Sequence, residues 1–203
     1  MKTSRSRFLV LLLIWGLAAA AAGALHVLVH LPPRTVPLVV AGMSIGLTFA
    51  VARVGWIGEA VRSFGVRGIL GFHVMRFAGA YFLLLEAQGR LPAEFAQRAG
   101  WGDIAAAGGA LVLVLGPATW RRGWTLAAWN IFGLIDLLVA VGTAGWLNVT
   151  RPGSMIEIAS LPLTLVPLFF VPLLMSSHFT FLRHLLRGKS SAVFPVGRPA
   201  FPT

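Results

Sequence analysis

WTLAAWNIFGLIDLLVAVGTAGWL, residues 124–147, is an apolar stretch that is long enough to cross a bilayer, and it carries one ionisable residue, Asp136. A spanning helix needs about 20 mainly apolar residues, and lipid offers no hydrogen-bond partner to an open backbone. On either side of this stretch, further apolar runs meet or approach the same length in residues 8–31, 37–57, 68–87, 104–120 and 158–182. The sequence therefore predicts an all-α, polytopic transmembrane helix bundle with about six spans.

The composition of the whole chain agrees with this class. Of the 203 residues, 57% are hydrophobic and only 11% are charged, whereas soluble domains carry about 25% charged residues. The formal net charge is +11, but the basic residues lie between apolar runs and do not cluster as on a nucleic-acid-binding face. We therefore expect a lipid bilayer, and no nucleic acid, as a partner. The absence of cysteine excludes disulfides, thiolate metal sites and cysteine nucleophiles.

Basic residues near the span ends predict the orientation, because cytoplasmic loops carry an excess of Lys and Arg. Six spans place both termini on the same side of the membrane, and Arg76 lies inside a span. Most of the other basic residues fall on the side of the termini. The exceptions are Arg34, Arg90, Arg98 and Arg151, on the opposite side. Both termini are therefore predicted to be cytoplasmic.

The first span allows a second interpretation. Residues 1–24 combine a basic start, an apolar stretch and small residues, which is also the pattern of a cleavable signal peptide. The apolar run continues to Leu31 and reaches full spanning length, which favours an uncleaved helix. Cleavage would leave five spans and an outer N-terminus.

The loop GRLPAEFAQRAGWGD, residues 89–103, contains Leu91, Phe95 and Ala99 at a spacing of four. This spacing predicts a short interfacial helix between the third and fourth spans. Asp103 suits the N-cap of a fourth span that begins at Ile104. We expect a single transmembrane domain over residues 1–188, followed by a proline-containing, disordered cytoplasmic tail over residues 189–203.

Arg76 and Asp136 are the ionisable residues nearest the middle of predicted spans. A charge at that depth costs about 2.5–3.5 kcal/mol, so it usually faces a partner or a water-filled cavity. His73 shares a helix face with Arg76, His178 of the sixth span is expected at a depth similar to that of His73, and Asn130 lies in the same span as Asp136. These five residues are our candidate buried polar site.

Three interpretations of this site remain open. Arg76 and Asp136 can pair to fix the helix register, with Asn130 bonding across helices. Alternatively, the five residues line a cavity that opens to the cytoplasm, in which Arg76 binds an anionic small molecule or lipid headgroup. A third possibility is a haem held between His73 and His178.

Recognised motifs add little chemistry. His26 and His30 are four residues apart and are candidate ligands for one metal ion. We find no zinc-protease, nucleophile-elbow or phosphate-loop motif. The expected function is therefore binding or transport without catalysis. A haem-bearing membrane redox protein and a non-catalytic subunit of a larger membrane complex are the alternatives.

Three stretches carry a resemblance to a known group of proteins. They are MRFAGAYFLL (residues 75–84), GRLPAEFAQRAGWGD (residues 89–103) and WNIFGLIDL (residues 129–137). In these stretches the chain resembles an uncharacterised family of small multi-pass prokaryotic membrane proteins. The resemblance implies a location in a prokaryotic inner or plasma membrane, and it supplies no catalytic residue.

Overall fold

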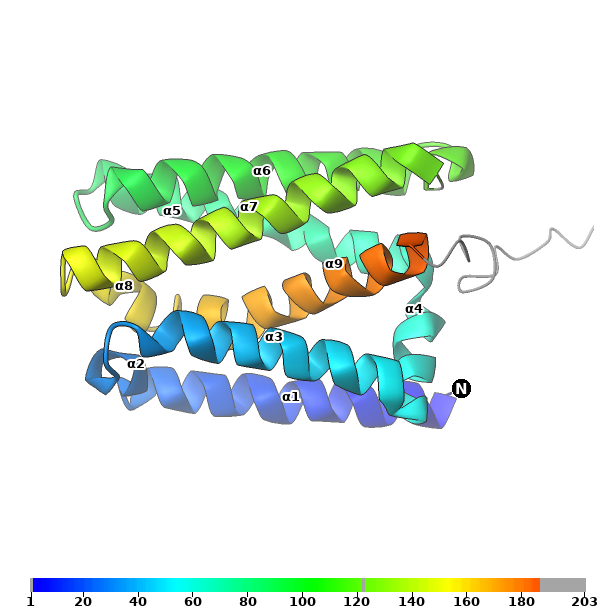
Figure 1. The fold of residues 1–203 in the computed structure, drawn as a ribbon, viewed down its shortest axis with the longest axis horizontal. Helices are drawn as coiled ribbons and strands as arrows, with labels where there is room; N and C mark the ends of the chain where they lie inside the picture. Colours follow the sequence, from blue (N-terminus) through cyan, green and yellow to red (C-terminus); the bar gives the residue numbers. More distant parts are fainter. Residues whose placement is uncertain (1, 122, 187–203) are drawn as a thin grey trace, which may run out of the picture.

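The computed structural model of the chain consists of helices packed along one long axis (Figure 1). It describes residues 2–121 and 123–186, and these residues form helices, turns and no strand. Six helical stretches are long and apolar enough to cross a membrane: Thr3–Ala24, Thr35–Arg53, Gly55–Ala87, Ala93–Leu115, Gly123–Thr150 and Val166–Arg183. The predicted all-α fold with six stretches of spanning length is therefore confirmed. The tail that we predicted to be disordered lies outside the described residues.

The first predicted span is two helices. α1 (Lys2–Ala24) ends at a turn in which His26 adopts a left-handed backbone with φ of 51°, and the single-turn α2 (Val27–His30) follows. The predicted continuous helix to residue 31 is therefore wrong. α3 (Thr35–Arg53) agrees with the second predicted span, and it packs mainly against the last helix.

The third stretch is longer than predicted and bends sharply. α4 (Gly55–His73) contains Gly65, whose φ of 65° lies in the region that glycine adopts without a steric penalty. The part of α4 before this glycine lies across the end of the bundle, and the part after it runs along the bundle (Figure 1). The 3₁₀ helix η1 (Val74–Gly79) and α5 (Ala80–Ala87) complete the stretch.

The fourth stretch corrects two predictions. α6 (Ala93–Leu115) is one continuous helix, so the separate interfacial helix and the N-cap role of Asp103 are both wrong. Gly100 does not interrupt α6 because it lies against its neighbours: a Cβ there would come within 2.8 Å of Leu83. α6 ends at Leu115, earlier than the predicted residue 120, because Pro117 follows the C-cap residue Gly116.

η2 (Ala118–Arg121) leads into α7 (Gly123–Thr150), which agrees with the fifth predicted span. The sixth begins later than residue 158. The short α8 (Ile156–Ala159) is separated by turns from the π-helical η3 (Val166–Phe170), which continues into α9 (Val171–Leu186). Pro172 has no N–H for the carbonyl one turn earlier. The Trp15 indole on α1 donates to that carbonyl, of Leu168, at 2.9 Å.

Candidate functional site

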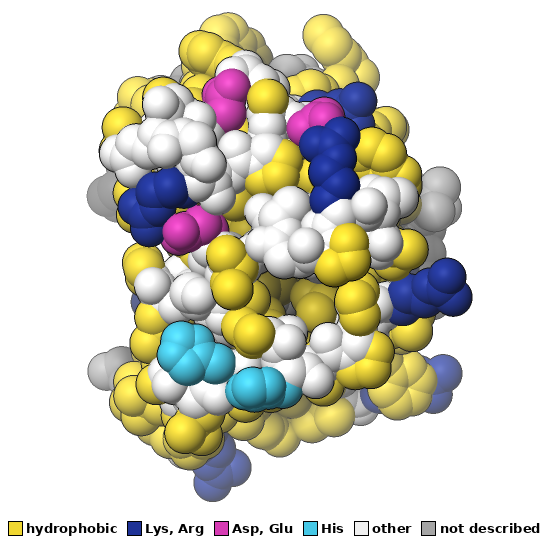
Figure 2. Space-filling model, turned by 90° about the vertical axis from the view of Figure 1, so that its left-hand side faces the viewer, with side chains coloured by type: hydrophobic (Ala, Val, Ile, Leu, Met, Phe, Trp, Pro, Cys, Tyr) yellow, Lys and Arg dark blue, Asp and Glu magenta, His cyan; other side chains and the backbone are white. Residues whose placement is uncertain are grey.

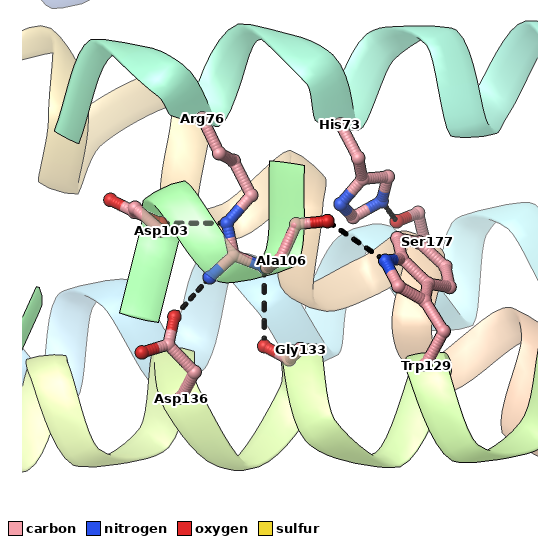
Figure 3. A network of polar contacts seen from close by, with 8 residues as sticks. All are labelled: His73, Arg76, Asp103, Ala106, Trp129, Gly133, Asp136 and Ser177. Atoms are coloured by element: carbon pink, nitrogen blue, oxygen red, sulfur yellow. Dashed lines mark hydrogen bonds and ion pairs between the residues drawn. The ribbon is translucent and has the colours of Figure 1, made fainter. Parts of the chain in front are cut away.

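Arg76 lies in η1 with its side chain almost fully buried (1% exposed). Its Nε donates to Asp103 Oδ1 at 2.6 Å, and its Nη2 forms an ion pair with Asp136 Oδ2. Its Nη1 donates to the Gly133 carbonyl at 3.4 Å. Figure 3 shows the guanidinium between the two carboxylates. The pairing of Arg76 with Asp136 is one of the interpretations left open by the sequence, and Asp103 is a second carboxylate partner that was not among the candidate site residues.

Asp103 reaches Arg76 because α6 does not stop at the predicted boundary. Phe95, Ala99 and Asp103 are spaced by four residues, so they share one face of the continuous helix. The sequence-based prediction assigns the first two to a separate interfacial helix and makes Asp103 the N-cap of the next span. The same four-residue spacing, extended by one step, would have placed Asp103 on the buried face.

Glycines allow the segments that carry these side chains to approach closely. A Cβ on Gly79 would lie 2.5 Å from the Asp103 Cβ, so η1 and α6 could not pack as they do with any larger residue. A Cβ on Gly102 would overlap the Asp136 carboxylate. Small residues are used in the same way where helices associate in lipid.

The cluster contains more acidic than basic groups. One guanidinium faces two carboxylates, and all three of its nitrogens already donate to protein oxygens. The second oxygens of Asp103 and Asp136 point away from Arg76 (Figure 3). Asp103 is the more accessible, with 18% of its side chain exposed against 9% for Asp136. We call these three residues the Arg76 cluster.

The remaining candidate residues form a separate group one turn away. His73 from α4 and His178 from α9 pack with Trp129 of α7, with ring centroids 4.5 Å apart for the two imidazoles. We call these three residues the ring cluster. Trp129 was not among the predicted site residues. Its indole donates to the Ala106 carbonyl of α6 at 2.9 Å, which ties the cluster to a fourth helix.

The hydrogen bonds of His73 define its tautomer. Ser177 donates its proton to the Leu174 carbonyl at 2.7 Å, so its oxygen accepts from His73 Nε2–H, also at 2.7 Å. The other ring nitrogen, Nδ1, is buried and has no hydrogen-bond partner in the described residues, so it carries the lone pair of a neutral imidazole.

The same reasoning applies to His178. The Asn130 amide nitrogen donates to the His178 carbonyl at 3.2 Å, so the amide oxygen accepts from His178 Nδ1–H at 2.9 Å. A bond of Asn130 across helices is part of the register-fixing interpretation that the sequence left open. The bond to Nδ1 leaves the lone pair of His178 on Nε2, which also has no partner among the described residues.

These residues do not fit a haem. An iron between His73 and His178 needs the macrocycle to lie between the two imidazoles. The rings are in direct contact, and Trp129 packs against both, so no slot of that shape exists. The proposed metal pair, His26 and His30, is not carried on one helix, because His26 lies in the turn before α2. In the described ranges, no group of three or more His, Cys, Asp or Glu is placed to hold a metal.

A cavity of about 290 Å³ lies beside the Arg76 cluster, at the end of the bundle opposite the N-terminus. Asp103 is its one charged lining residue among those described, and the rest is mainly apolar. Part of its wall comes from α7, through Leu137, Val141 and Ala144. Figure 2 views this end and shows a hollow with apolar side chains around it. One open interpretation was a polar cavity lined by the five candidate residues, but none of these five lines this cavity.

Residues 33–186 match a protein family described as a domain of unknown function (DUF8737). The match covers most of the chain, so the protein belongs to this family. It includes all three stretches that carried the resemblance to an uncharacterised family. No curated protein and no solved structure matches the chain.

Proposed function

We propose that this member of the DUF8737 family is a six-span integral membrane protein that binds a small apolar molecule with a cationic group. The observation that carries the proposal is the apolar cavity with the Asp103 carboxylate in its wall. The apolar lining would bury the body of the ligand, and Asp103 would face its charge. At about 290 Å³, the cavity is near the lower end of ligand sites, which span about 300–1,000 Å³.

The surface supports insertion into a membrane. Large apolar side chains are highly exposed along the bundle, among them Leu13 (62%), Leu38 (70%) and Ile45 (65%). Contiguous apolar surface of this kind is costly in water and is ordinary against lipid. With the orientation predicted from the basic residues, both termini are cytoplasmic and the cavity opens to the outer side.

The charge balance supports a cationic ligand over an anionic one. The anionic ligand that we expected at Arg76 stays a prediction, but the fork of this arginine is already used by two carboxylates and a carbonyl. With both carboxylates ionised, the Arg76 cluster has an excess negative charge. A cation in the cavity would reduce this excess, whereas an anion would add to it.

Insertion and orientation can be tested first, because the chain has no cysteine of its own. Gln88 lies at the cavity end and Gly55 at the opposite end, and both residues are exposed. The single-cysteine variants Gln88→Cys and Gly55→Cys therefore each report on one end. In intact cells, a membrane-impermeant maleimide should label only Gln88→Cys. Labelling of Gly55→Cys should require permeabilised cells. Recovery of the protein in the soluble fraction, or the reverse labelling, would contradict this part of the proposal.

Ligand binding can be tested by calorimetry on detergent-purified protein with benzyltrimethylammonium and its neutral carbon isostere, neopentylbenzene. We expect the cation to bind about tenfold more tightly, which corresponds to about 1.4 kcal/mol, because its charge would lie near the Asp103 carboxylate in a partly buried site. Asp103→Asn should remove that preference. Equal binding of the two probes would show that the charge of the ligand is not recognised.

A matched pair of variants tests whether the cavity is the site. Ala144→Leu places extra volume in the cavity, and Ala128→Leu places the same volume on an exposed position of the same helix. Binding should be lost in the first variant and kept in the second. Unchanged binding to Ala144→Leu would move the site elsewhere.

A further inference from the structure

The two ends of the bundle differ in how their arginines are used. At the cavity end, Arg90 pairs with Glu157 at 2.8 Å and Arg151 pairs with Glu94 at 2.6 Å. At the end that carries the N-terminus, exposed arginines come from the start of α1, the end of α3 and the bent α4; they are Arg5, Arg7, Arg53, Arg62 and Arg67. Among the described residues, none of these five forms an ion pair.

An apolar groove of about 260 Å³ lies at this same end, between α1, α3, α4 and α9. Its walls include Phe8 and Leu9 of α1, Val51 of α3, Phe64 of α4 and Leu173 of α9. The groove adjoins the bend at Gly65, where the first part of α4 turns across the end of the bundle. Among the described residues, its polar lining consists of three hydroxyl side chains of α9: Ser176, Ser177 and Thr180.

One arginine connects the charged end to the groove. The Arg5 guanidinium carbon lies 4.7 Å from the centre of the Phe64 ring, and Phe64 lines the groove. Phe8, one helical turn after Arg5, lines it as well. The Arg5 guanidinium therefore lies at the edge of the apolar groove.

We propose that this groove binds one acyl chain of an anionic phospholipid whose phosphate is held by Arg5. The apolar walls match the chain, and the unpaired basic surface matches the negative headgroup. A basic residue at such a surface strengthens anionic-lipid binding by about fivefold. This inference rests on membrane insertion, but it does not depend on the ligand proposed at Asp103. The Cys-labelling experiment tests insertion separately.

The chain offers a matched control for Arg5. Arg53 belongs to the same end, and its guanidinium carbon lies 5.2 Å from the centre of the Phe49 ring, which does not line the groove. Arg5→Gln and Arg53→Gln thus remove the same charge and the same kind of ring contact. Only the first removes a cation beside the groove.

The experiment places the full chain in phosphatidylcholine nanodiscs with a minor fraction of phosphatidylglycerol and measures retained lipid by native mass spectrometry. The wild type should retain phosphatidylglycerol selectively. Arg5→Gln should reduce this retention about fivefold, and Arg53→Gln should leave it nearly unchanged. Equal loss in both variants would indicate diffuse attraction to a basic surface and overturn the site, as would the absence of any preference for phosphatidylglycerol.

Two further arms test the groove and the source of the phosphate. Leu9→Trp fills the groove and should displace the lipid, whereas Leu13→Trp changes an exposed position on the same helix outside it and should not. Glycerol phosphate, which has the headgroup chemistry without chains, should fail to compete. Effective competition by glycerol phosphate, or retention of lipid by Leu9→Trp, would overturn the acyl-chain site.

Discussion

The Arg76 cluster and the ring cluster lie one helical turn apart, and they show two ways of burying polar side chains. In the first, a guanidinium contacts two carboxylates, and its burial depends on charge pairing. In the second, two neutral imidazoles satisfy one nitrogen each through Ser177 and Asn130. The buried charges of the Arg76 cluster come from η1, α6 and α7, which supply groups of opposite sign. This cluster borders the cavity through Asp103. The side chains of the ring cluster pack against one another.

The largest effect should come from removing the central charge. Arg76→Leu leaves two buried carboxylates without a partner, and we expect it to destabilise the protein by about 3–5 kcal/mol. SDS-titration unfolding and the amount of protein in the membrane fraction measure the loss. The triple variant with Arg76→Leu, Asp103→Asn and Asp136→Asn removes all three charges and should recover much of the stability. Similar instability in both variants would show that charge pairing is not the reason for the effect.

A smaller loss should follow from disturbing the approach of α6 to α7. Gly102→Ala places a methyl group against the Asp136 carboxylate, and overpacking of this kind costs about 1–3 kcal/mol. Gly108→Ala, on the same helix with open space around its Cβ position, is the control and should lose nothing. The same unfolding titration compares the two. Equal stability would mean that the Arg76 cluster tolerates a wider separation than the structure shows.

The ring cluster should be more tolerant than the Arg76 cluster. His73→Phe removes one neutral hydrogen bond and keeps the ring, and Ser177 retains its bond to the Leu174 carbonyl. We expect a loss of about 1 kcal/mol in the unfolding titration. A loss as large as that of Arg76→Leu would remove the distinction between the two clusters.

The smallest effect concerns haem. Because the rings of His73, Trp129 and His178 contact one another, adding haem to the purified protein should produce no dithionite-sensitive shift of a Soret band. A shift that disappears in both His73→Phe and His178→Phe would show that the ring cluster opens to admit the cofactor. It would also make the redox alternative the better hypothesis.

Asp103 shows where prediction from sequence failed and why. Its surroundings contain Gly100 and Gly102, which in isolation suggest a turn before a new helix. In the fold these glycines face Leu83 and Asp136, so close packing compensates for their poor helix propensity and α6 continues. Local propensity was thus overruled by contacts with segments distant in sequence.

The sequence by itself determined the all-helical class, the approximate positions of the six apolar stretches, and the presence of Arg76 and Asp136 within them. These are local properties, because hydrophobic length and the cost of a buried charge depend on one segment at a time. Only the tertiary structure decided that Asp103 completes the Arg76 cluster, that His73 and His178 contact each other, and that a cavity borders Asp103. Those outcomes depend on how closely helices approach and which faces meet, and both are set by the packing of several segments together.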